Sequence, residues 1–251
     1  MSGHSKWATI KHKKGAQDKA RGKLFAKLLK QVEVAARTGG GDVNANATLR
    51  TFVQKCRDSS VPVDTIERAI KRGTGELEGV VYEQIAYEGY APNGVAMYVE
   101  TLTDNRNRAA AEIKNIFTRN NGSLAEPGAV AWQFDRKGVI IVDKSAGVDE
   151  DDLMMTALEA GADDVDDQGD TWQVTTPPGD VMKVRDALDG AGITVASADL
   201  TMLPQNTVPL GSESEARAVL KVLDALEEHD DVQAVYANFD IPDDILQNVM
   251  A

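Results

Sequence analysis

The chain has 251 residues, of which 42% are hydrophobic and 27% charged, enough for one large domain or several small ones. No apolar run approaches the roughly 18 residues that a membrane helix requires, so we expect no membrane span. The single cysteine, Cys56, cannot form an internal disulfide, and the N-terminus lacks the apolar stretch of a secretory signal. Both features favour a cytoplasmic protein, although the basic first thirty residues leave a mitochondrial presequence open.

The net charge of −13 hides a division along the chain. Residues 1–80 hold 16 Lys and Arg against 8 Asp and Glu, net +8, whereas residues 81–251 hold 11 against 32, net −21. The first 30 residues contain a single acid, Asp18, among nine bases. Such a segment predicts a polyanionic partner, although a basic tail can also dock on the chain's own acidic body.

The residues from 16 to 37 predict one helix, which the glycines 39–41 terminate. At about 100° per residue, four lysines fall within about 80° of one another, opposite the apolar stripe. We therefore expect a row of ammonium groups in solvent, made by Lys19, Lys23, Lys27 and Lys30. Arg21 falls on the apolar side and is expected to snorkel.

Two further helices complete a predicted three-helix bundle. The first covers 46–57 and buries Cys56 in the core. The second begins after Pro62, with Asp64 as its N-cap, and ends at Gly73.

After residue 79 the hydrophobic period changes from helical to alternating, which indicates a new domain. Strands are expected at 81–90 and 95–102 around the turn Pro92-Asn93-Gly94, followed by a helix at 105–119. Residues 139–199 then show a βαββαβ order, and a helix at 213–228 and a strand at 232–239 can complete the earlier sheet. The pattern predicts an α+β multidomain protein, in which an N-terminal three-helix bundle precedes two α/β (ferredoxin-like) domains, the last inserted into the middle one. The expected domains are 1–78 (basic, helical and nucleic-acid-binding), 80–130 plus 205–245 (discontinuous α/β) and 131–204 (the inserted βαββαβ unit).

The sequence lacks the residue spacings that known enzyme motifs and metal-binding motifs require. A P-loop, a dinucleotide-binding glycine motif and a nucleophile elbow are all missing from the sequence. The three histidines have no zinc spacing, and an EF-hand-like alignment starting at Asp164 places Thr175 where a bidentate Glu is needed. We expect neither a catalytic site, a metal nor a cofactor.

The leading basic segment supplies the other candidate nucleic-acid contacts. The indole of Trp7 can stack on a base or anchor the segment to the bundle. The imidazole of His12 is better suited to stacking or hydrogen bonding with nucleic acid than to catalysis. The candidates in this segment are Lys6, Trp7, Lys11, His12, Lys13 and Lys14.

Four motifs together resemble the YebC/PmpR family, which includes the mitochondrial translational activator of cytochrome c oxidase. They are residues 3–14 (GHSKWATIKHKK), 21–25 (RGKLF), 88–95 (EGYAPNGV) and 103–108 (TDNRNR), and the resemblance spans nearly the whole chain. It implies a helical N-terminal domain, two α/β domains with the last inserted, and a basic N-terminal stretch that belongs to the folded protein. Two positions depart from the family pattern: Ala20, where a further base is common, and Ala109, where Thr is usual. The fourth motif adds secondary binding candidates, Asn105, Arg106 and Arg108.

Two functions follow from this resemblance. Members are labelled probable transcriptional regulators that bind DNA, whereas others act on translation at the ribosome and help difficult, proline-rich peptide synthesis. Lysine pairs with phosphate as a point charge and distinguishes bases poorly, so the residues alone leave DNA and ribosomal or transfer RNA as alternatives and slightly favour RNA. The sequence does not indicate an oligomeric state.

Overall fold

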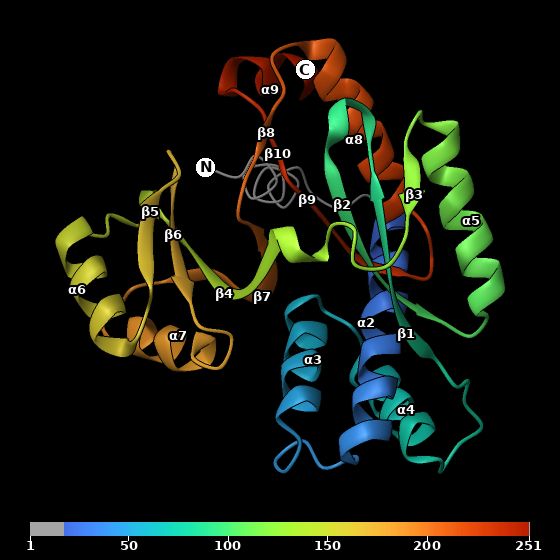
Figure 1. Cartoon of the computed structure of the whole chain (residues 1–251). Coiled ribbons are helices and arrows are strands. Elements are labelled where there is room, and N and C mark those ends of the chain that lie inside the picture. The colour runs from blue at the N-terminus through green and yellow to red at the C-terminus, as the bar shows by residue number, and fades with distance from the viewer. Residues whose placement is uncertain (1–17, 251) are drawn as a thin grey trace.

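The computed structural model describes residues 18–250, which form three parts (Figure 1). The first part is a bundle of three helices at the bottom of the view: α2 (Asp18–Gly39), α3 (Ala47–Asp58) and α4 (Val63–Thr74). Their inward side chains form one apolar core that includes Val32, Leu49 and Cys56. Burial raises the pKa of the Cys56 thiol to about 11, consistent with a core residue.

Both predicted ends of the third helix are corrected by the structure. Helix α4 starts at Val63, with Pro62 at the N-cap and no side-chain cap hydrogen bond, so Asp64 is not the cap. Asp64 lies in the first turn, where a negative charge is favourable to the helix dipole. Gly73 lies inside the helix, which ends at Thr74 and has Gly75 as its C-cap in the left-handed conformation, φ 84°. A Cβ at Gly73 would lie 2.4 Å from the carbonyl oxygen of Glu33, so this glycine lets α4 approach α2 closely.

The second part is a four-stranded antiparallel sheet in the order β3-β1-β2-β9. Its strands are β1 (Glu83–Tyr90), β2 (Ala96–Thr103), β3 (Ser123–Ala125) and β9 (Val232–Ala237). The first two form the predicted hairpin, with Asn93 in the left-handed region at φ 64° within the short helix η1 (Pro92–Gly94). Two helices pack against this sheet through a common apolar core: α5 (Arg106–Arg119) and α8 (Glu213–Glu227).

The third part is a second antiparallel sheet, at the left of Figure 1, in the order β5-β6-β4-β7. Numbered from its own first strand, this order is 2-3-1-4, that of a ferredoxin-like split βαβ unit. Its elements are β4 (Phe134–Asp143), α6 (Glu150–Ala160), β5 (Asp164–Asp167), β6 (Thr171–Thr176), α7 (Val181–Gly190) and β7 (Val195–Pro204).

One buried carboxylate fixes the connection between the two sheets. Glu88 on β1 is 7% exposed, and its oxygens accept hydrogen bonds from the backbone amides of Gly128, Val130 and Ala131 at 2.7, 2.6 and 2.8 Å. Burial alone would raise the pKa of Glu88, but these three bonds outweigh it and lower the pKa below its ordinary value. An ionised side chain therefore fixes the loop that leads from the sheet β3-β1-β2-β9 (the middle sheet) into β4.

The predicted fold class is confirmed, since within residues 18–250 three helices precede two antiparallel sheets with helices. Strand β9 returns to pair with β2 after the whole second sheet, as the predicted insertion requires. The sequence pattern did not predict the smallest elements and the last helix: β3, η2 (Ala131–Gln133), η3 (Lys144–Ala146), the paired β8 (Val208–Pro209) and β10 (Phe239–Asp240), and α9 (Asp243–Met250). The domain boundaries themselves stay a prediction. Across residues 18–250, no helix is both long and apolar enough to cross a membrane.

Candidate nucleic-acid interface

The predicted interface is described in part. Lys19 and Arg21 lie in α2, and three described side chains of the lysine row, Lys23, Lys27 and Lys30, follow them on the same helix. The candidates Lys6, Trp7, Lys11, His12, Lys13 and Lys14 lie outside the described residues.

The ammonium groups of Lys23, Lys27 and Lys30 do not project freely into solvent, which corrects the prediction from helical periodicity for these three residues. The Nζ of Lys23 donates to the carbonyl oxygen of Glu228 at 2.9 Å, and the Nζ of Lys27 donates to that of Glu227 at 2.6 Å. The Nζ of Lys30 donates to the carbonyl oxygen of Asp230 at 3.0 Å. All three ammonium groups thus contact the C-terminal end of α8 and the loop that follows it.

The C-terminal end of α8 offers carbonyl oxygens that attract the lysine ammonium groups. The last carbonyls of an α-helix have no partner within the helix and carry the negative end of its dipole. Helix α8 has no basic residue in its last turn to compensate. Lysines from α2, about 200 residues earlier in the chain, supply these positive charges instead.

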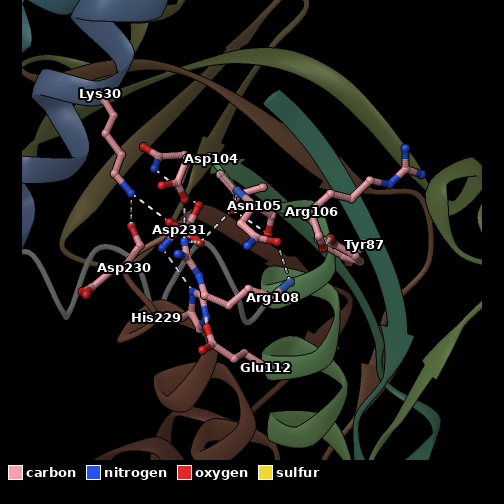
Figure 2. A network of polar contacts seen from close by, with 12 residues as sticks. Lys30, Tyr87, Asp104, Asn105, Arg106, Arg108, Glu112, His229, Asp230 and Asp231 are labelled. Atoms are coloured by element: carbon pink, nitrogen blue, oxygen red, sulfur yellow. Dashed lines mark hydrogen bonds and ion pairs between the residues drawn. The ribbon is translucent and has the colours of Figure 1, made fainter. Parts of the chain in front are cut away.

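Asp231, whose side chain is only 6% exposed, joins the lysine row to the second candidate group (Figure 2). One carboxylate oxygen lies 2.9 Å from the Nζ of Lys30, and the other accepts from the Nη2 of Arg108 and the hydroxyl of Thr103, both at 2.9 Å. Burial would raise the pKa of Asp231, but the hydrogen bonds from Arg108, Lys30 and Thr103 together lower it. Asp231 is therefore an ionised centre that connects α2, β2 and α5.

The three residues of the second candidate group have different surroundings. Asn105 caps α5, since its side-chain oxygen accepts from the backbone amide of Arg108 at 3.1 Å. Arg108 also pairs with Asp104 at 2.7 Å. The exposed guanidinium of Arg106 points away from Asp231 in Figure 2, whereas the guanidinium of Arg108 contacts the Asp231 carboxylate.

His229, two residues before Asp231, extends the polar network to α5. The Nδ1 of His229 accepts from the backbone amide of Asp231 at 3.1 Å. The other ring nitrogen, Nε2, therefore carries the hydrogen and donates to Glu112 at 2.7 Å. These bonds link the loop after α8 to α5.

A cavity of about 520 Å³ lies where these elements meet. It is lined by Lys23, Lys30, Tyr82, Asp104, Arg108, Glu112, Glu228, His229, Asp230 and Asp231. Five of these residues are acids and three are lysine or arginine, so with His229 neutral the lining carries a formal charge of −2. In this arrangement the cavity does not attract phosphate, although it contains three predicted phosphate contacts.

Within residues 18–250, no group of three or more His, Cys, Asp or Glu side chains could hold a metal ion. The carboxylate of Asp231 is paired with Lys30, Arg108 and the hydroxyl of Thr103, and that of Asp104 with Arg108. These carboxylates therefore form ion pairs and a hydrogen bond that join α2, β2 and α5.

Two family models cover almost the whole chain: the TACO1/YebC protein N-terminal domain matches residues 5–76, and the TACO1/YebC second and third domain matches residues 82–239. The chain belongs to the TACO1/YebC family. Probable transcriptional regulatory proteins from Halothermothrix orenii and Acidothermus cellulolyticus are 55% and 56% identical to it over 250 residues. The first match covers 99% of each chain, and the second covers 99% of this chain and 100% of the relative. The crystal structure of a conserved hypothetical protein from Aquifex aeolicus is 44% identical, with a TM-score of 0.81, over 90% of this chain and 93% of that one.

The TACO1/YebC motif at 103–108 has a structural role that the sequence did not reveal. Thr103, Asp104 and Arg108 from this motif meet Lys30 through Asp231, a residue that the sequence analysis did not select. The available signal was an acid directly before an apolar strand, at the end of a helix without terminal bases. That pattern indicates a buried acid that needs cationic partners from elsewhere in the fold.

Proposed function

We propose that this TACO1/YebC chain is a non-enzymatic regulator of gene expression that binds DNA through its basic N-terminal residues, 1–78. The observation that carries the proposal is the charge division, net +8 in residues 1–80 against −21 in the remainder. A polyanion is attracted to the first part and repelled by the second. The names of the relatives, probable transcriptional regulatory proteins, support a role in transcription.

The geometry of α2 supports binding to a phosphate backbone. Its three described lysines share one face, and each donates to an oxygen acceptor, which is the chemistry that a phosphate also offers. The 22 residues of α2 extend over about 33 Å, the length of about ten base pairs at 3.4 Å per step. Ammonium groups read charge and position and leave the base sequence largely unread.

Fluorescence anisotropy of a labelled DNA duplex of about 20 base pairs, titrated with the full chain at several salt concentrations, tests the proposal. Each lysine that neutralises a phosphate adds about 0.9 to the slope of log affinity against log salt. We expect Lys23→Gln, Lys27→Gln and Lys30→Gln together to weaken binding and to lower the slope by up to about 2.7.

A matched control removes the same three charges from the acidic part of the chain. Lys114, Lys183 and Lys221 are exposed, and their replacement by Gln should leave the salt slope unchanged. Equal slopes for both triple variants would contradict binding through α2. An RNA hairpin of similar length, run in parallel, distinguishes the ligands: stronger binding to RNA than to DNA would indicate a translation factor that contacts ribosomal or transfer RNA.

A further inference from the structure

Four lysines connect the bundle to the rest of the molecule. Its apolar core contains residues from 25 to 70 only and includes no side chain of either sheet. Lys23, Lys27 and Lys30 reach the end of α8, and Lys55 on α3 pairs with Asp199 on β7. Contacts of this kind weaken as salt rises, so the position of the bundle depends on charge.

The end of α8 and a DNA backbone require the same ammonium groups. The Lys30 side chain is only 18% exposed because it lies between Asp231 and the carbonyl oxygen of Asp230. It also lies over the ring of Tyr82, 5.4 Å from the ring centroid. A duplex cannot approach this side chain while the end of α8 covers it, and the surrounding acids oppose a polyanion.

We propose that the contact between α2 and the end of α8 is an autoinhibitory latch, in which the carbonyls of Glu227, Glu228 and Asp230 and the carboxylate of Asp231 hold the ammonium groups of Lys23, Lys27 and Lys30 away from nucleic acid. This inference rests on the proposed function, because the competing ligand is the DNA backbone. Phosphates displace the carbonyls from the lysines, and the bundle then separates from α8. The affinity measured for DNA is the intrinsic affinity of the lysine row reduced by the fraction of molecules with an open latch.

The test is a substitution that leaves every lysine in place. Asp231→Asn keeps the shape of the side chain and an acceptor for Thr103, but it removes the charge that holds Lys30 and Arg108. Loss of one charge-assisted contact of this kind should raise affinity for a labelled DNA duplex by about tenfold.

Asp230→Asn is the matched control. It removes the same charge one residue away, from an exposed side chain, and leaves the carbonyl that Lys30 contacts. A general gain from lower negative charge would appear equally in both variants, whereas the latch predicts a clearly larger gain for Asp231→Asn. Equal gains would overturn the latch.

Amide hydrogen exchange of the unmodified chain provides a second measurement that does not depend on the folding of a variant. Addition of the duplex should increase exchange in peptides covering residues 226–232, because loss of the lysine contacts uncovers this segment and lets its backbone amides open to solvent more often. Protection or no change in this segment, at DNA concentrations that saturate binding, would refute the latch and leave DNA binding intact. Failure of the unmodified chain and of both variants to bind DNA at low salt would instead remove the proposed function, and the latch with it.

Discussion

Gly73→Ala tests whether the close approach of α2 and α4 determines the stability of the bundle. An added Cβ would lie 2.4 Å from the carbonyl oxygen of Glu33 and 2.7 Å from the Cβ of Ala36, whereas Cβ contacts below 3.0 Å essentially do not occur. The helices must therefore separate by about 0.6 Å, the difference between 3.0 and 2.4 Å. Overpacking of this kind costs about 1–3 kcal/mol, and the better helix propensity of alanine returns about 1 kcal/mol.

The net expectation for Gly73→Ala is a bundle less stable by on the order of 1 kcal/mol. Gly22 is the matched control, since it lies in α2 and an added Cβ would have no atom of another described element within 4 Å. Gly22→Ala should leave the bundle as stable or stabilise it by up to about 1 kcal/mol.

The single cysteine gives an assay that reports on the bundle alone. Cys56 is fully buried in the bundle core, so a thiol reagent modifies it only when the bundle opens. Under conditions where opening is at equilibrium, a loss of 1 kcal/mol accelerates labelling about fivefold. Labelling of Gly73→Ala at or below the unmodified rate would refute the packing argument.

Two further substitutions test other polar anchors of the fold. Glu88→Gln should lower the free energy of unfolding at neutral pH by about 1.5–3 kcal/mol, because charge-assisted bonds are lost. The pKa of Glu88 is lowered in the folded chain, so its contribution to the free energy of unfolding is present above the ordinary pKa of about 4.3 and is lost as pH falls through the folded pKa. Denaturant unfolding should therefore show the stabilities of the unmodified chain and Glu88→Gln converging in acid. A stability difference that does not change with pH would contradict this. Asn46→Ala removes the cap on Leu49 and the hydrogen bonds to the carbonyls of Ala35 and Gly40, and should accelerate Cys56 labelling by about tenfold or more. Asn105→Ala, which removes an exposed cap outside the bundle, should leave that labelling rate unchanged.

Hydrophobic period and capping residues predicted most of the elements. The structure confirms the predicted hairpin turn at Pro92-Asn93-Gly94. This turn can be predicted because the left-handed backbone at Asn93 and Gly94 depends on the residue types at those two positions. The prediction of Asp64 as the N-cap is wrong because the N-cap is Pro62, two residues earlier in the chain. The predicted helix end at Gly73 is also wrong, since the sequence alone does not distinguish a glycine that ends a helix from one that lets another helix approach.

The candidate site was less predictable than the fold. Helical periodicity identified which lysines share a face of α2, but it contains no information on what covers that face. The cover comes from Glu227, Glu228 and Asp230, about 200 residues later in the chain. The acid that joins the two candidate groups, Asp231, is likewise defined only by long-range pairing.

The return of β9 to the middle sheet also affects how the chain is made. During synthesis β2 emerges more than 120 residues before β9, so one of its edges has no native partner until the ferredoxin-like unit has left the ribosome. An unpaired edge of this length is a template for wrong pairing with other chains. If residues 134–204 fold first, the effective loop between β2 and β9 becomes shorter, and the sheet β3-β1-β2-β9 closes last.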